Sequence, residues 1–181
     1  MLICRPEAAG DLARALTDHH RGSGVRTVGY DDIDAVTEVP ALVYFLTDPA
    51  PAHRPERDRS VPALLRLVRR LLALGAAHTP LAVRAVLFGA VAATGGEPLR
   101  PHAAGLLGLC ATAAAEYPRW TVGCVDAGTT PAAPERLAAL LAREPAADRL
   151  IALRDGQRLR RTLSAVRPAA ANRPGVRAVR T

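Results

Sequence analysis

Short apolar runs alternate with amphipathic helical segments along most of this chain, and this alternation restricts its fold more than any other feature. The runs are rich in Val, Leu and Ala, which is typical of strands buried on both faces of a parallel sheet. The helical segments carry apolar residues at three- and four-residue spacing, so one side of each can pack on that sheet. The expected strands are residues 1–5, 25–30, 41–47, 81–91 and 120–128, and the expected helices are residues 10–24, 61–75, 102–117 and 134–144.

The last expected elements form a hairpin. Residues 148–166 predict two strands joined by an Asp-Gly turn. A helix between successive strands implies parallel pairing with helices on both faces. We therefore expect an α/β fold, a truncated Rossmann-like, doubly wound and mostly parallel sheet with a C-terminal hairpin. This domain would span residues 1–166, with a basic Pro/Ala-rich linker or tail at 167–181. Ser60 is expected to cap the helix that begins after it.

The positive charge of the chain is concentrated at its C-terminal end. The net charge is +7, and all 24 basic residues are arginine. Residues 152–181 hold eight arginines and one acid, which accounts for the whole excess, whereas the rest of the chain is balanced. Arginines can neutralise phosphates, but this segment has no aromatic residue on which a base could stack. We therefore expect no nucleic-acid partner, although an Arg-tailed binding module stays an alternative.

Several kinds of chemistry are excluded by missing residues. A chain without lysine can form no Schiff base, no P-loop phosphate contact and no Tyr-x-x-x-Lys pair. The three cysteines, Cys4, Cys110 and Cys124, lie far apart without a CxxC spacing, so we expect small buried side chains and no metal site. No apolar run reaches the roughly 18–20 residues that cross a bilayer, and the first residues lack a secretory pattern, so we expect a cytoplasmic protein with no membrane partner.

A dinucleotide site would lie at the turn after the first strand. That site needs the glycines of G-x-G-x-x-G, which let the backbone approach a pyrophosphate. The turn here is CRPEAAGDLA, where Gly10 stands alone and Glu7 and Asp11 place carboxylates where a phosphate would lie. An aspartate of YDDID (residues 30–34) could hold a ribose hydroxyl, but without the glycine turn we expect a solvated loop. The sequence thus predicts no cofactor-binding residue.

The histidines form no recognisable catalytic pattern. His19 and His20 are adjacent, so on a helix they point about 100° apart and cannot bind one metal ion together. His102 is close in sequence to Thr94 and Glu97 and could act as a base, but no nucleophile motif accompanies it. We therefore predict no catalytic or metal-ligating residue. The other candidates are expected to be solvated or structural: His53, His78, Tyr117 packed at its helix end, and Trp120 anchoring the sheet edge or an interface.

Residues 102–128, HAAGLLGLCATAAAEYPRWTVGCVDAG, resemble a helix–strand unit of ketoreductase regions in modular polyketide synthases. That unit is similar to Ala-x-x-Gly-Leu-x-Arg-x-x-x-x-Glu-x-Pro followed by a Trp and a Val-Asp strand. The family's arginine after Gly-Leu is missing, and Cys110 and Ala111 stand there. The matching residues are Ala104, Gly108, Leu109, Glu116, Pro118, Trp120, Val125 and Asp126. A second match to the family's C-terminal pattern consists of Asp148, Leu150, Ala152, Arg154, Gly156, Arg158, Arg161 and Leu163.

The resemblance implies a role without catalysis. In this family the first Rossmann-like half is structural, and the second half carries the glycine-rich NADPH turn and the catalytic Ser, Tyr and Lys or Asn. The matching segments belong to the first half, so NADPH is expected only in a catalytic partner half. The implied partners are that half or adjacent synthase domains. A divergent NADPH-dependent short-chain reductase acting on a β-ketothioester is an alternative.

Overall fold

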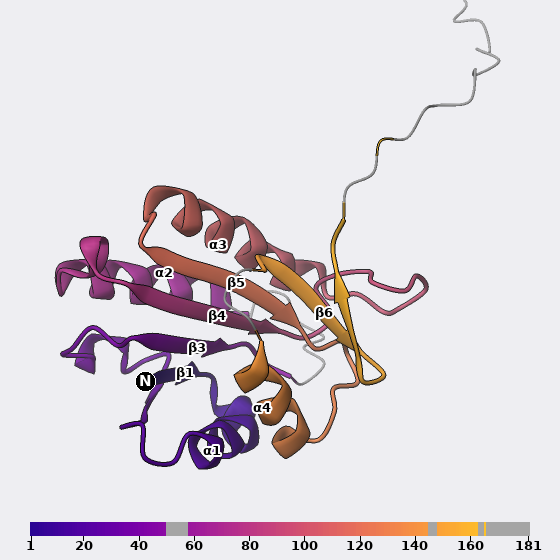
Figure 1. Cartoon of the computed structure of the whole chain (residues 1–181), viewed down its shortest axis with the longest axis horizontal. Coiled ribbons are helices and arrows are strands. Elements are labelled where there is room, and N and C mark those ends of the chain that lie inside the picture. The colour runs from indigo at the N-terminus through magenta and orange to yellow at the C-terminus, as the bar shows by residue number, and fades with distance from the viewer. Residues whose placement is uncertain (50–57, 145–147, 163–164, 166–181) are drawn as a thin grey trace, which may run out of the picture.

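A single seven-stranded sheet forms the centre of the computed structural model, which describes residues 1–49, 58–144, 148–162 and 165 (Figure 1). The strand order is β2-β1-β3-β4-β5-β6-β7; all neighbours are parallel except β6 and β7. This confirms the expected fold class, including the C-terminal hairpin. The strands are β1 (Leu2–Arg5), β2 (Arg26–Gly29), β3 (Leu42–Leu46), β4 (Leu81–Leu87), β5 (Trp120–Asp126), β6 (Leu150–Arg154) and β7 (Gln157–Arg160).

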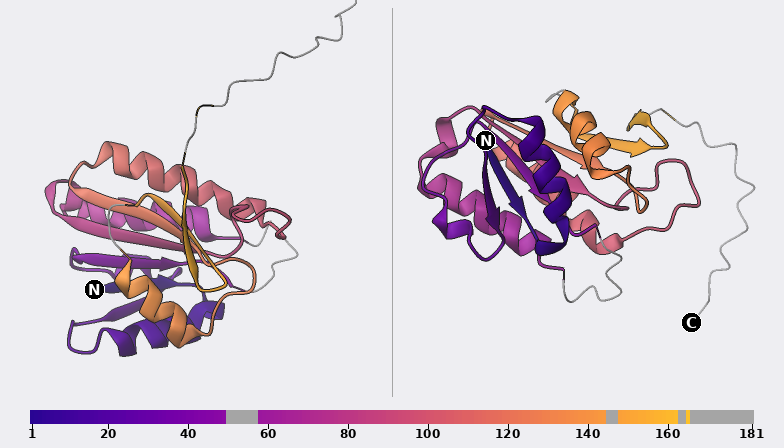
Figure 2. Two further views of the ribbon diagram at one scale, coloured as in Figure 1. Left: turned by 45° about the vertical axis from the view of Figure 1, so that its right-hand side comes forward. Right: turned by 90° about the horizontal axis from the view of Figure 1, so that it is seen from below.

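Helices cover both faces of the sheet. On one face α1 (Gly10–His19) packs against α4 (Pro134–Arg143), and on the other α2 (Ser60–Ala73) lies beside α3 (Gly105–Glu116) (Figures 1 and 2). This arrangement follows from crossovers that place successive helices on either side of a parallel sheet. Among the described residues, no helix is long and apolar enough to span a membrane.

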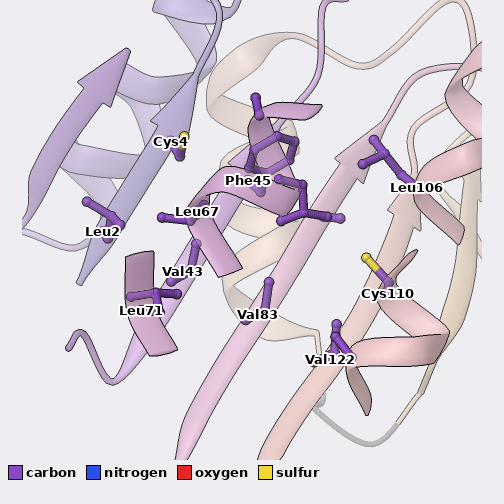
Figure 3. Close-up of a cluster of buried hydrophobic side chains, with 14 of the residues drawn as sticks. Leu2, Cys4, Val43, Phe45, Leu67, Leu71, Val83, Leu106, Cys110 and Val122 are labelled. Atoms are coloured by element: carbon purple, nitrogen blue, oxygen red, sulfur yellow. The ribbon is translucent and has the colours of Figure 1, made fainter. Parts of the chain in front are cut away.

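Two apolar layers follow from the alternation of side chains along each strand. Figure 3 shows the layer beneath α2 and α3, where strand residues such as Val43 and Val83 meet Leu67 of α2 and Leu106 of α3. All three cysteines are buried, as expected, and burial raises the pKa of the Cys4 thiol to about 12. The opposite layer joins the sheet to α1 and α4, and its members include Ile3, Leu16, Tyr44, Val86, Val125, Leu141 and Ile151.

Several elements end earlier than the sequence indicated. The helix expected over residues 10–24 ends at His19, and the chain then passes through Gly22 in the left-handed region (φ 91°). The last strand, expected to extend towards residue 166, ends at Arg160. The Asp155–Gly156 turn is confirmed, because both residues have positive φ (49° and 77°), as a two-residue type I′ hairpin turn requires.

The predicted cap of α2 is wrong by one residue. Arg59 occupies the N-cap position, and its side chain makes no capping hydrogen bond. Oδ1 of Asp58, one residue earlier, accepts a hydrogen bond from the Ser60 N–H at 2.8 Å. Ser60 is the first helical residue, and its buried hydroxyl has no hydrogen-bond partner among the described residues. Arginine is not a preferred N-cap residue, so the local sequence did not indicate this helix start.

Trp120 lies in the core, whereas the sequence predicted an anchor at the sheet edge or at an interface. It begins β5, which has β4 and β6 as neighbours, and its side chain is almost fully buried. The indole Nε1 donates a hydrogen bond to the Ala76 carbonyl at 2.9 Å, and the ring lies 4.7 Å from that of Tyr117. Trp120 therefore fixes the start of β5 to the connection between α2 and β4, and Tyr117 packs at its helix end as expected.

Replacing Trp120 should test this anchor. Trp120→Phe should lower the free energy of unfolding by about 1–3 kcal/mol, because the Ala76 carbonyl loses its donor and the smaller ring leaves a cavity. Urea denaturation followed by far-UV circular dichroism measures the change. Tyr117→Phe keeps its ring and should shift stability by less than about 0.5 kcal/mol. Equal unfolding midpoints for the two variants would contradict the anchoring role.

Candidate functional site

The first βα turn is occupied by a side chain of the chain itself. A Rossmann-like sheet binds its ligand at the carboxyl ends of the strands where their order reverses, here between β1 and β3. Arg5, the last residue of β1, folds back there, and its Nη1 donates to the carbonyls of Pro6 and Glu7, each at 3.1 Å. A Cβ placed on Gly10 would lie 3.6 Å from this Nη1. The single glycine therefore faces Arg5 and opens no cradle for a pyrophosphate.

Carboxylates surround the N-terminus of α1. Glu7 and Asp11 are both exposed, and Asp11 lies in the first turn of the helix, 3.4 Å from Arg14. Negative side chains are stabilised by the positive N-terminal end of the helix dipole. They therefore take the place that the bound phosphate has in nucleotide-binding folds of this kind. The turn thus lacks the glycine-lined backbone of a phosphate cradle, and Glu7 and Asp11 offset the positive charge of Arg5.

The YDDID loop is not the solvated loop that we expected. The Tyr30 hydroxyl donates to the Leu46 carbonyl at 2.6 Å, and Ile33 is completely buried. The loop carries apolar side chains at positions that face α2, which explains this docking. Its exposed aspartates pair with arginines: Asp31 with Arg59, and Asp34 with Arg66. Hydrogen bonds from these arginines lower the pKa of both carboxyls.

The histidine candidates do not form a site. His102 precedes α3 and lies 3.9 Å from Asp58, so it contacts the start of α2, whereas Glu97 is bound to Arg154. His20 Nε2 is 3.4 Å from the Tyr44 hydroxyl. His78 is exposed, and His53 lies outside the described residues. In the described ranges, no group of three or more His, Cys, Asp or Glu side chains could hold a metal ion.

The densest polar cluster lies where β4, β5 and β6 end. Asp126 is the last residue of β5 and is completely buried, and Arg154 is the last residue of β6. Arg154 Nη2 donates to Asp126 Oδ2 at 3.0 Å, and its Nε donates to Glu97 Oε1 at 2.8 Å. Glu97 comes from the connection between β4 and α3. We call these three side chains the strand-end network.

Main-chain groups satisfy the rest of the strand-end network. Besides its two carboxylates, Arg154 donates to three carbonyls, those of Val91, Asp126 and Leu153. The Asp126 carboxylate accepts the N–H groups of Gly89, Val91 and Gly128, and the Glu97 carboxylate accepts those of Ala93, Thr94 and Gly95. These bonds, led by the one from Arg154, lower the pKa of Glu97 to about 2. Glu97 is therefore an anion near neutral pH and cannot act as a proton donor there.

A cavity of about 530 Å³ adjoins the strand-end network. It lies between the loop after β5, the first turns of α4 and the β6–β7 turn, with Leu137 and Leu140 on its apolar side. Glu97 and Arg154 in its wall are bound to each other, whereas Arg136 and Asp155, which also line it, form no ion pair with another described residue. From the sequence, Glu97 was a candidate only as a neighbour of His102. Its pairing with Arg154 has no local sequence signal.

Removing Arg154 should destabilise the fold strongly. Arg154→Met leaves two carboxylates without their cation, one of them fully buried, and should cost about 3–5 kcal/mol in the free energy of unfolding. Thermal and urea unfolding measure the loss. Arg160→Ala, on the exposed side of the same hairpin, is the matched control and should change stability by less than about 0.5 kcal/mol. Similar losses for both variants would contradict a special role of Arg154.

The low pKa of Glu97 predicts a pH dependence of stability. The folded state lowers this pKa from 4.5 to about 2, so the stabilisation is complete above 4.5 and is lost as the pH falls towards 2. Glu97→Gln should remove this contribution and flatten the acid limb of the stability profile between those values. Urea unfolding at a series of pH values tests this. Parallel acid limbs for the variant and the parent chain would contradict it.

Comparisons with known proteins agree with this geometry. The family model described as "Polyketide synthase extender module SpnB, Rossmann fold domain" matches residues 5–163. The first ketoreductase of the tylosin polyketide synthase is 24% identical, with a TM-score of 0.62, over 88% of this chain and 37% of that one. A structure of A-type ketoreductases from a modular polyketide synthase is 21% identical, with a TM-score of 0.63, over 96% and 40%.

These two structures are less than 25% identical and share the fold with this chain, and so do more distant structures. A short-chain dehydrogenase/reductase from Vibrio parahaemolyticus is 11% identical, with a TM-score of 0.58, over 78% of this chain and 91% of that one. No curated protein matches. The chain spans less than half the length of the two ketoreductase structures described above. Because the family model covers most of the chain, this protein belongs to the family of polyketide synthase Rossmann-fold domains represented by the extender module SpnB.

Proposed function

We propose that this chain is the non-catalytic structural subdomain of a polyketide synthase ketoreductase, which supports a catalytic half or a neighbouring synthase domain. The closed first βα turn carries the proposal. Arg5 covers the backbone that a pyrophosphate would approach, and Asp11 places a carboxylate at the N-terminus of α1. A nucleotide would have to displace Arg5, and its phosphates would be repelled by the carboxylate of Asp11.

The lack of a Tyr–Lys pair on α3 supports the same proposal. In the resembling dehydrogenases, the helix before the β5-like strand carries Tyr and Lys. Here α3 is GLLGLCATAAAE, and the chain contains no lysine. The strongest polar groups at the strand ends are hydrogen-bonded to one another in the strand-end network. Helix α3 therefore lacks the Tyr–Lys pair that those dehydrogenases use.

The outer surface of α2 and α3 is suited to docking. The only charged residue of α3 is Glu116, although one side of this helix is exposed. Uncharged helix faces are usually covered by another element. Leu65 of α2 is 37% exposed, and Leu99 in the segment leading to α3 is 47% exposed. We call this surface the α2–α3 face; its other exposed residues include Gly105, Gly108, Ala111, Thr112 and Ala115. Such apolar patches often bind partners.

Calorimetric titration with NADPH tests the absence of a cofactor site. We expect no saturable binding up to concentrations on the order of 1 mM, because the turn lacks the glycine-rich backbone that holds a pyrophosphate and Arg5 is held by the carbonyls of Pro6 and Glu7. A catalytic ketoreductase half titrated under the same conditions is the positive control. A micromolar dissociation constant for this chain, or hydride transfer to a β-ketothioester, would contradict the proposal.

A docking experiment tests the α2–α3 face. The chain mixed with a catalytic ketoreductase half should elute as one complex in size-exclusion chromatography. Gly108→Arg should weaken the complex about tenfold or more, because a Cβ added at Gly108 meets nothing within 4 Å in the free chain and the long side chain would obstruct a partner. Gly108→Ala is the matched control and should bind normally. Unchanged binding by Gly108→Arg would exclude this face, and no complex with the parent chain would contradict the proposed function.

A further inference from the structure

The hairpin leaves one strip of the sheet without a covering helix. Ala152 of β6 and Leu159 of β7 are paired and lie on the α2–α3 side of the sheet, in the same row as Asp126 of β5. Helix α3 packs on β5, and α4 lies on the opposite face (Figure 1). A groove of about 210 Å³ lies along this strip, and its lining includes Leu150, Ala152, Leu159 and the segment 91–93. The groove is therefore apolar at its centre.

Strand β7 also presents an open hydrogen-bonding edge. It is the last strand of the described sheet and pairs only with β6 there. In a two-residue hairpin the pair next to the turn, here Arg154 and Gln157, is hydrogen-bonded, and such pairs alternate along the ladder. The main-chain groups of Gln157 and Leu159 consequently point to β6, whereas those of Arg158 and Arg160 point away from the sheet. Outward-facing groups of this kind pair readily with another strand.

The edge of β7 carries arginines, whose charge favours an acidic partner. Arg158 is bound to Glu144 and Asp148, so its charge is compensated. Arg160 lies 3.9 Å from Asp148 with 64% of its side chain exposed, and Arg161 is exposed without an ion pair in the described part of the chain. The edge thus has surplus positive charge beside an apolar groove. Leu159 faces the groove, while Arg160 faces the α4 side.

We propose that β7 accepts an extended segment of a partner polypeptide, with alternating apolar and acidic residues, as an additional strand of the sheet. Its apolar side chains extend the groove around Leu159. Its carboxylates lie beside Arg160 on the other face, as an opposite-charge cross-strand pair. This contact is independent of the α2–α3 face and of any particular synthase domain.

Fluorescence anisotropy with labelled peptides tests the proposal on the full chain. The probe is Glu-Val-Glu-Val-Glu-Val-Glu, and the control is Lys-Val-Lys-Val-Lys-Val-Lys, which keeps the apolar pattern and reverses the charge. We expect the acidic peptide to bind at least about tenfold more tightly. Equal binding of the two peptides, or no binding of the acidic one, would overturn the proposal.

Two variants separate main-chain pairing from charge attraction. Arg160→Ala and Arg160→Pro both remove the charge, but only the proline removes the outward N–H, which does not pair with β6. We expect Arg160→Pro to bind the acidic peptide about fivefold more weakly than Arg160→Ala, with circular dichroism melting curves confirming that both fold. Equal affinities of the two variants would show attraction without strand addition and would overturn the proposal.

Two further measurements identify the occupant. Analytical ultracentrifugation of the parent chain should show a monomer; a concentration-dependent dimer abolished by Arg160→Pro would assign this edge to a second copy and overturn the proposal. Gly108→Arg should bind the acidic peptide like the parent chain, because it lies on the α2–α3 face. A failure of edge pairing is thereby distinguished from a failure of docking at that face.

Discussion

The buried carboxylate of Asp126 is the constraint that organises one whole edge of this molecule. A fully buried charge costs several kcal/mol unless it is paired and hydrogen-bonded. Arg154 supplies the cation, and main-chain N–H groups supply the remaining donors. A Cβ on Gly128 would lie only 3.2 Å from Arg154 Nη1, so the chain passes close to the guanidinium here. The ends of β5 and β6 and the connection after β4 are thereby fixed relative to one another.

The buried Asp126 also affects where this chain can bind another molecule. The carboxyl ends of parallel strands are where such sheets usually bind ligands, because loop side chains and main-chain donors converge there. In this chain Arg5 and the strand-end network use those groups internally. The interaction capacity that remains lies elsewhere, on the α2–α3 face, where α3 carries no charge before Glu116, and on the open edge of β7. Both features favour protein partners over a small-molecule substrate.

Local sequence patterns predicted the strands and the hairpin turn, but not the contacts that depend on the order of the strands in the sheet. Alternation gave the strands, and the Asp-Gly pair gave the hairpin turn. Trp120 was misplaced because only the tertiary arrangement shows that its strand is central. Asp126 and Arg154 stood out through their resemblance to a family, and their positions at the ends of adjacent strands explain why they meet. The pairing of Glu97 with Arg154 could not be predicted in the same way, because the two residues are 57 positions apart in the sequence.

The use of arginine without lysine suits a framework of this kind. Arg154 makes five hydrogen bonds to two carboxylates and three carbonyls, whereas a lysine ammonium has three donors. Arg84, buried in the middle of β4, donates to the Glu144 carbonyl just after α4. Gly123 leaves space for these groups, since a Cβ there would lie 2.7 Å from the Asp148 carbonyl oxygen and 3.2 Å from Arg84 Nη1. Guanidinium groups therefore connect loops and a helix end to the sheet both at the strand ends and in the middle of β4. A planar cation with several donors suits such contacts better than an ammonium group.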